Sequence, residues 1–135
     1  MKVITTLAVV ALVFMVSCKK SKFVPTDGLF GKWEVRRVYN GNILPADSIY
    51  KPGNGNTLQL NPDSTYVKYV QHKFYSNGVY HTRINLMLMV AMPNELLYFD
   101  NDTTFTYLVT MNGDLMTLKP LFPDIPTTDY QKIQN

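Results

Sequence analysis

Two histidines and ten carboxylates are the side chains with which this chain could carry out metal or acid–base chemistry. His72 and His81 have no Asp or Glu near them in the sequence, so neither has a partner at metal-ligand spacing. Most Asp residues lie in segments rich in Asn, Gly and Pro, where Asp usually caps the backbone of a turn. The chain also lacks a nucleophile elbow, a phosphate-binding loop and a zinc-protease motif. We therefore expect no enzymatic activity, no metal and no cofactor.

The one cysteine, Cys18, directly follows an uncharged segment over residues 3–17. Lys2 precedes this segment, and its apolar centre at 7–16 is shorter than the about 20 residues that a membrane-spanning helix needs. A positive start followed by a short apolar run is typical of a secretory signal peptide. Met15-Val16-Ser17-Cys18 resembles the lipobox of bacterial lipoproteins, in which an aliphatic residue and two smaller ones precede the acceptor cysteine.

The lipobox resemblance implies a lipid anchor. It implies cleavage before Cys18, a thioether-linked diacylglycerol on that cysteine and an acylated amine, with palmitate as a typical chain. Each buried methylene contributes about 0.8 kcal/mol, so two or more chains anchor a protein stably where one does not. We expect a signal peptide at 1–17, a lipidated cysteine and linker at 18–29, and one domain at 30–135. The protein would be an exported lipoprotein of the outer membrane of a Gram-negative cell.

The part of the chain that should fold is nearly neutral. The whole sequence has 13 Lys and Arg against 10 Asp and Glu. Four of the basic residues, Lys2, Lys19, Lys20 and Lys22, precede Phe23, so nine remain against all ten acidic residues. A nucleic-acid-binding domain would carry a basic surface. We therefore expect no nucleic-acid partner.

An all-β fold is predicted from the pattern after residue 30. Runs rich in Val, Thr, Tyr, Phe and Leu alternate with Asn, Gly, Asp and Pro, and no stretch has the 3.6-residue period of a helix. The connections are too short for parallel crossovers, so consecutive strands should pair antiparallel as a meander. The expected strands are 31–39, 57–60, 65–75, 79–85 continuing into 86–91, 95–99, 103–111, 114–119 and 130–133, with an irregular loop at 41–56.

Two Asn-Gly pairs predict the hairpins, because Asn-Gly favours the two-residue type I′ turn. A loop at Asn77-Gly78 would place Tyr75 opposite Tyr80. The inner face of this first hairpin would include Tyr69, Leu86 and Leu88, and its outer face would include Lys68 and His72.

The second pair, Asn112-Gly113, predicts a hairpin in which Val109 faces Met116. Phe105, Tyr107 and Met116 would then point inward. Both hairpins alternate apolar and polar residues, which indicates a sheet with one buried face and one wet face.

A meander of about eight strands removes its exposed edges by closing into a barrel, with an open β-sandwich as the alternative. Gly31-Lys32-Trp33, at the start of the first strand, resembles the Gly-X-Trp motif of lipocalins, and the order of motif, long loop and hairpins is similar too. The chain looks most like the small lipocalin-like domains of bacterial lipoproteins. The resemblance implies that Trp33 lies at the closed end of the barrel under Lys132, in a cation–π contact. Trp33 as a core residue without that partner is the alternative.

By the same analogy, the barrel would bind a small hydrophobic ligand. If Trp33 and Val35 point inward, so does Arg37, which there could bind a carboxylate or phosphate. A β-bulge that exposes Arg36 and Arg37 is the alternative. The expected ligand-binding residues are Arg37, Tyr69, Leu86, Leu88, Phe105, Tyr107 and Met116.

The segment from Leu86 to Met92 is apolar at all seven positions, including three Met. A strand that is apolar on both faces is either covered on both sides or meets a partner through a soft Met-rich surface. This segment supports a second function hypothesis. In that hypothesis the chain is a structural or interaction protein of the cell envelope, with a barrel packed by its own side chains and no ligand.

Overall fold

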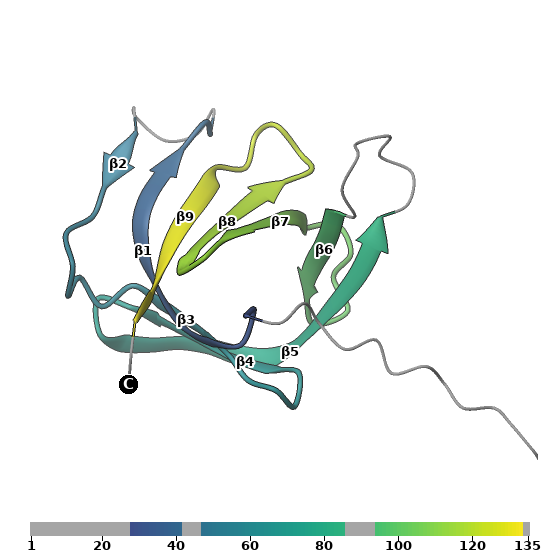
Figure 1. The fold of residues 1–135 in the computed structure, drawn as a ribbon, viewed down its shortest axis with the longest axis horizontal. Helices are drawn as coiled ribbons and strands as arrows, with labels where there is room; N and C mark the ends of the chain where they lie inside the picture. The colour runs from purple at the N-terminus through teal and green to yellow at the C-terminus, as the bar shows by residue number, and fades with distance from the viewer. Residues whose placement is uncertain (1–27, 42–46, 86–93, 134–135) are drawn as a thin grey trace, which may run out of the picture.

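The structure is a computed structural model that describes residues 28–41, 47–85 and 94–133. The predicted signal peptide, Cys18 and the apolar segment that begins at Leu86 lie outside the described residues. The described chain contains strands and no helix (Figure 1). The strands are β1 (Gly31–Tyr39), β2 (Ser48–Ile49), β3 (Thr57–Leu60), β4 (Thr65–Val70), β5 (Lys73–Asn85), β6 (Asn94–Phe99), β7 (Thr106–Asn112), β8 (Leu115–Pro120) and β9 (Thr127–Ile133).

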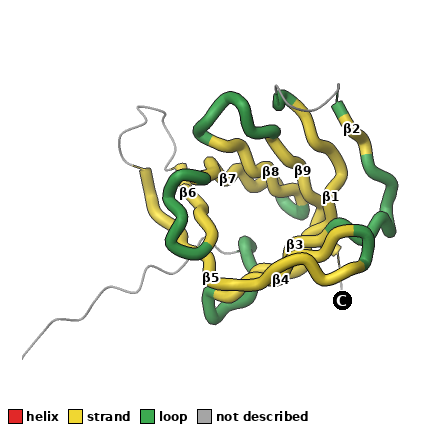
Figure 2. The backbone as a smooth tube through the Cα atoms, turned by 180° about the vertical axis from the view of Figure 1, so that it is seen from behind, coloured by secondary structure: helices red, strands yellow, loops and turns green. Residues whose placement is uncertain are grey.

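The sheet closes on itself into an antiparallel barrel of eight strands. From β3 to β9 each strand pairs with its successor, and β1 pairs with β3 on one side and with β9 on the other. The closing pair joins Lys32 to Ile133 at one end and Tyr39 to Thr127 at the other. The short β2 adds to the upper half of β1 outside this ring (Figure 2). The predicted meander barrel is therefore confirmed, and the open sandwich is excluded.

The predicted hairpin at Asn77-Gly78 is wrong. Both residues lie inside β5, where Gly78 faces Tyr66, and the turn between β4 and β5 is Gln71-His72. Both turn residues have positive φ, 50° and 66°, as a type I′ turn requires. Tyr75 does not face Tyr80; its side chain is 70% exposed.

Long-range contacts explain this difference. The Gln71 amide donates to Asn56 Oδ1 at 3.0 Å and the His72 amide donates to the Gly55 carbonyl at 3.0 Å, so the loop before β3 supports the strained turn. Gly78, in contrast, is a site of close approach, because a Cβ there would overlap the Asp100 carboxylate. A glycine in a strand often marks such an approach rather than a turn.

The second hairpin turns one residue later than predicted. Its loop is Gly113-Asp114, and only Gly113 has positive φ, at 59°. Each residue of β7 consequently pairs two positions further along β8, so that Val109 faces Leu118 rather than Met116. A slip of two positions preserves the face on which each side chain lies, which is why Val109 and Met116 are buried as expected.

Trp33 anchors the packed end of the barrel. Its ring is fully buried and its Nε1 donates to the Leu29 carbonyl at 2.9 Å. Lys132 Nζ lies 5.2 Å from the ring centroid and donates to the Gly28 carbonyl at 3.1 Å, so the predicted Trp33–Lys132 contact is confirmed. Gly31 has φ of 137°, and a Cβ there would lie 2.6 Å from the Lys132 stem. The core comprises Leu29, Trp33, Leu58, Leu60, Tyr66, Tyr80, Leu97, Val109, Met116 and Leu118.

A candidate ligand site inside the barrel

Lys68 is the one lysine of β4, and it points into the barrel. It pairs with Leu58 on β3 and Ser76 on β5, and it lies two residues after the buried Tyr66, on the same face. Lys68 Nζ lies 3.8 Å from the centroid of the Phe99 ring and 5.2 Å from that of Tyr66. The hairpin expected from the sequence would place Lys68 on the outer face. That placement is wrong because it followed from the wrong hairpin, and a register that differs by an odd number of residues exchanges the two faces of a strand.

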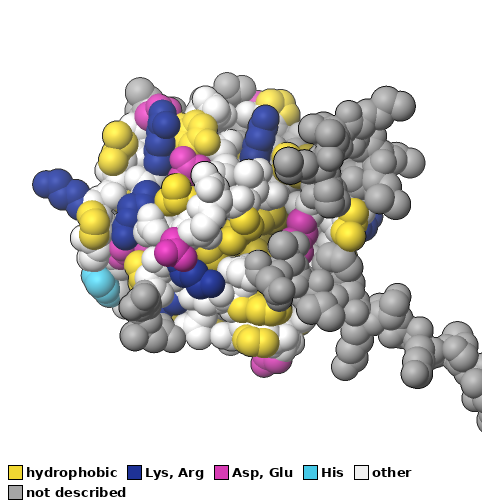
Figure 3. All heavy atoms as spheres, viewed as in Figure 1, with side chains coloured by type: hydrophobic (Ala, Val, Ile, Leu, Met, Phe, Trp, Pro, Cys, Tyr) yellow, Lys and Arg dark blue, Asp and Glu magenta, His cyan; other side chains and the backbone are white. Residues whose placement is uncertain are grey.

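Two clefts meet at Lys68. We call the first the Asp100 cleft; it has a volume of about 230 Å³ and opens beside the β6–β7 loop. We call the second the Tyr130 cleft; it has a volume of about 160 Å³ and opens between the ends of β3 and β4. In the view of Figure 3, apolar side chains lie in the middle of the molecule with charged side chains around them.

The residues that line each cleft are as follows. The Asp100 cleft is lined by Tyr66, Lys68, Phe99, Asp100, Asp102, Phe105 and Tyr107, and the Tyr130 cleft by Val35, Asn56, Thr57, Leu58, Lys68, Tyr69, Val70, Tyr75 and Tyr130.

The charge of Lys68 is only partly compensated. Within the described residues its ammonium makes no hydrogen bond or ion pair, and its contacts are the two aromatic rings. Burial lowers the pKa of Lys68, and the Asp100 charge opposes that shift. The Asp100 carboxylate is itself engaged, because it accepts hydrogen bonds from the Tyr66 hydroxyl at 2.9 Å and the Val79 amide at 3.1 Å. Lys68 is thus a cation inside a barrel with room beside it.

Tyr107 in the Asp100 cleft and Tyr130 in the Tyr130 cleft are neutral hydrogen-bonding groups. Burial raises the pKa of the Tyr107 hydroxyl, and it raises the pKa of the Tyr130 hydroxyl further above its ordinary value. Neither hydroxyl is ionised at neutral pH, so each can donate a proton in a hydrogen bond.

Two register shifts shape the Tyr130 cleft. In the β1–β9 pair the shift lies between Val35 and Arg37, so Arg36 is the extra residue. In the β4–β5 pair it lies after Lys68, and Tyr75 is the extra residue. Such bulges bend a strand and aim side chains away from the regular alternation.

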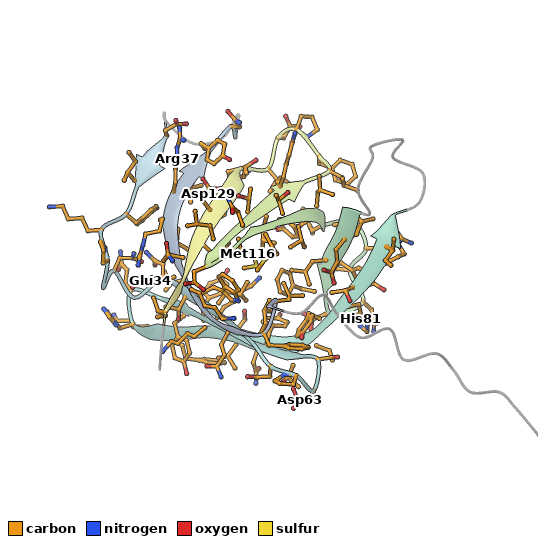
Figure 4. The ribbon with its side chains drawn as sticks, viewed as in Figure 1. Glu34, Arg37, Asp63, His81, Met116 and Asp129 are labelled. Carbon is orange, nitrogen blue, oxygen red and sulfur yellow. The ribbon has the colours of Figure 1, made fainter. Side chains whose placement is uncertain are left out.

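The bulge also decides the place of Arg37. The bulge is observed, but it exposes only Arg37, which is on the outer surface, where it pairs with Asp47 and covers the Tyr39 ring at 4.5 Å (Figure 4). Arg36 is half-buried and pairs with Glu34. Arg37 therefore lines neither cleft.

The other predicted ligand residues divide into three groups. Phe105 and Tyr107 line the Asp100 cleft, and Tyr69 lines the Tyr130 cleft. Met116 is fully buried in the core at the centre of the barrel (Figure 4). Leu86 and Leu88 lie outside the described residues.

A larger groove, of about 480 Å³, lies on the outer face of β1, β3 and β4. Its central polar group is Glu34, which is 4% exposed. The Glu34 carboxylate accepts hydrogen bonds from the Gly53 amide at 3.0 Å and the Gly55 amide at 3.3 Å, and it pairs with Arg36. Burial would raise the pKa of Glu34, but these hydrogen bonds outweigh it and hold the pKa below its ordinary value. The polar centre of this groove therefore has a structural role, because Glu34 holds the loop before β3 in place. We place the candidate ligand site inside the barrel instead.

The histidines do not come together. His72 lies in the β4–β5 turn, and His81 stacks on Tyr98 with ring centroids 5.0 Å apart. No three His, Cys, Asp or Glu side chains of the described residues form a cluster that could hold a metal ion. Nor does that part of the chain contain a helix long and apolar enough to cross a membrane.

Comparisons with protein-family models, with curated proteins and with solved structures find no match. Lys68 is the site residue that the sequence analysis missed. The alternation within 65–70 gives a signal for it, because Tyr66 and Lys68 share a face and Tyr66 is large and apolar enough to be buried.

Proposed function

We propose that this chain is a lipid-anchored envelope protein whose lipocalin-like barrel binds a small molecule beside Lys68. The observation that carries the proposal is the Lys68 ammonium itself, which lies where two clefts meet and is unpaired within the described residues. Burying a cation without a partner is unfavourable. A ligand that completes the contacts of Lys68 would offset that cost, and the clefts provide the space for it.

The size of the clefts limits the ligand. Pockets for drug-sized molecules typically enclose about 300–1,000 Å³, whereas the clefts enclose about 230 and 160 Å³. Trp33 and nine other buried side chains of the described residues fill the core of the barrel. We therefore propose a ligand smaller than the usual cargo of a wide barrel, held close to one mouth.

The anchor belongs to the same proposal and rests on the sequence. Cys18 after the apolar run would carry the diacylglycerol, and nine residues of linker separate it from Gly28. That length spans at most about 35 Å when extended, so the barrel would work close to the membrane surface. We propose the outer membrane as its location.

Native mass spectrometry of the full chain, produced in a Gram-negative host and released gently from detergent, tests both parts. A covalent lipid raises the mass in denaturing spectra as well as in native ones. A bound ligand adds a few hundred daltons or less in native spectra alone. The two masses therefore report separately on the anchor and on the binding site.

Three matched variants locate the ligand. Tyr107→Trp fills the Asp100 cleft, Val35→Phe fills the Tyr130 cleft, and Tyr98→Trp adds the same ring on the outer face of β6. Loss of the adduct in one of the first two, with retention in the third, supports the proposal. A clean apo mass, unchanged by extracts of the envelope, would contradict it and favour the interaction hypothesis, in which the barrel is packed and a partner binds the segment that begins at Leu86.

A further inference from the structure

The two clefts differ in the charge that surrounds Lys68. The Asp100 cleft contains two carboxylates, Asp100 and Asp102, beside the single ammonium. The Tyr130 cleft contains no carboxylate among its described lining residues, and Lys68 is its only charged group. An anion is therefore repelled from the first cleft and attracted into the second.

A site with a single cation favours a ligand group that carries a single negative charge. Phosphate groups are usually bound by several donors, as in an Arg cluster or a backbone nest. The Tyr130 cleft is lined by one lysine, Lys68, whose ammonium lies against the Phe99 and Tyr66 rings of the adjoining Asp100 cleft. The flexible lysine stem can turn this ammonium toward either cleft, and the other polar groups of the Tyr130 cleft are neutral side chains, among them Asn56, Thr57 and Tyr130. This set matches a carboxylate, which has one charge and two acceptor oxygens.

The remaining lining is apolar and aromatic. Val35 and Leu58 form the inner wall, and Tyr69, Tyr75 and Tyr130 contribute rings. A volume of about 160 Å³ equals the liquid volume of about five water molecules at roughly 30 Å³ each. Rings of this kind bind planar apolar groups by edge-to-face and stacked contacts. The ligand body is consequently small, flat and apolar.

The geometry points to a small aromatic or short-chain monocarboxylic acid, bound in the Tyr130 cleft with its carboxylate on Lys68 and its apolar body against the tyrosine rings. This inference rests on the proposed function and adds the charge class of the ligand and the cleft that holds it. The anion also favours the protonated form of Lys68, which burial disfavours.

Calorimetric titration of the full chain with 3-phenylpropionate and with its neutral amide tests the inference, since the two probes differ only in the charged group. We expect the acid to bind at least ten-fold more tightly than the amide, the ratio that one charge-assisted hydrogen bond supplies. Lys68→Met should reduce the ratio to about two-fold or less. Lys73→Met, which removes the same charge from the exposed start of β5, should leave it unchanged.

Val35→Phe provides a second variant that keeps Lys68 and fills only the Tyr130 cleft. We expect it to weaken binding of the acid at least ten-fold, whereas Tyr98→Trp, on the outer face of β6, leaves that affinity unchanged. Equal affinity for acid and amide in the wild type would overturn the charge class and leave the proposed binding function standing. A native adduct with no affinity for either probe would overturn the inference alone, and the absence of both would overturn the proposed function as well.

Discussion

Glu34 offers the most direct test of how the barrel holds the loop before β3, because its buried carboxylate accepts hydrogen bonds from two amides of that loop. Replacement by Ala removes the acceptor of the Gly53 and Gly55 amides and the ion partner of Arg36. Gly53 is exposed and its amide can bind water instead, whereas Gly55 is buried. The unsatisfied group that remains after the substitution is therefore the Gly55 amide.

The expected loss of stability follows from these contacts. A buried donor left unsatisfied costs about 1–3 kcal/mol, and a hydrogen bond to a charged group contributes about 1.5–3 kcal/mol. We expect Glu34→Ala to lower the free energy of unfolding by about 3 kcal/mol, which for a domain of this size lowers Tm by roughly 10–20 °C. Glu34→Gln keeps a carbonyl acceptor and loses the charge, so its cost should be about 1–2 kcal/mol.

The pH dependence has a definite sign. The folded-state pKa of Glu34 lies below the value of 4.5 that the free side chain has. The unfolded chain therefore binds the proton first as the pH falls, and the stabilisation is complete above about pH 4.5 and is lost as the pH falls through the folded-state pKa. The difference in stability between wild type and Glu34→Gln should shrink over that interval.

Urea unfolding at several pH values, followed by the fluorescence of Trp33, measures these differences. Asp114→Ala, at an exposed turn, is the control and should change stability by less than about 0.5 kcal/mol. Amide exchange adds a local readout, because the His72 amide donates to Gly55 and should exchange faster when the loop is released. If Glu34→Ala cost less than 1 kcal/mol and left the exchange of His72 unchanged, the carboxylate would not be a clamp and the reasoning would be refuted.

Three further predictions address the packed end, the strand register and the anchor. Lys132→Met should lower the free energy of unfolding by about 1–2 kcal/mol, through loss of the cation–π contact with Trp33 and of one hydrogen bond, as measured by urea unfolding; a change within error would show that the contact is not stabilising. Gly78→Ala should cost about 2–3 kcal/mol and Asn77→Ala less than 0.5 kcal/mol, since Gly78 meets the Asp100 carboxylate and neither residue forms a turn; the reverse order in thermal unfolding would favour the hairpin that the sequence predicts. Cys18→Ser should abolish labelling by radioactive palmitate and shift the protein out of the membrane fraction, and continued labelling would exclude the lipid anchor.

The sequence predicts the eight strands of the barrel and most of their positions, because apolar alternation and turn residues are local signals. It does not predict β2, which lies in the segment 41–56 that was expected to be an irregular loop. The bounds 31–39 and 57–60 agree with β1 and β3 residue for residue. The sequence also predicts that the sheet closes into a barrel, since a meander of about eight strands has few other ways to cover its exposed edges. Even the displaced turn at Gly113 leaves the inner face of β7 and β8 unchanged.

The register of the first hairpin was beyond local reasoning. Asn77-Gly78 is a strong turn signal, and Gln71-His72 is a weak one, because Gln rarely adopts positive φ and His does so far less readily than Gly. The tertiary structure reverses this preference, since loop residues from 53 to 56 bind the Gln71-His72 turn and Asp100 occupies the space beside Gly78. Both contacts join segments more than ten residues apart, and neither leaves a trace in the local pattern. Because the wrong hairpin places Lys68 on the outer face, Lys68 is missing from the ligand-binding residues that the sequence predicts.

The irregular features of the barrel, which are two register shifts and a strained turn, lie around the Tyr130 cleft. Both register shifts in the described strand pairs lie on the Tyr130 cleft, with Val35 before one and Lys68 before the other. The strained turn at Gln71-His72 closes the adjacent end of β4 and β5. A regular barrel of this size could be filled by its own side chains, as the end around Trp33 is. Departures from regularity are unfavourable unless the surrounding contacts require them, and here several of them surround the one lysine of the barrel interior that lacks a partner within the described residues. Packing alone does not require bulges, a strained turn and a cation without a partner at the same mouth of the barrel. Binding of an anion at this mouth would account for all three.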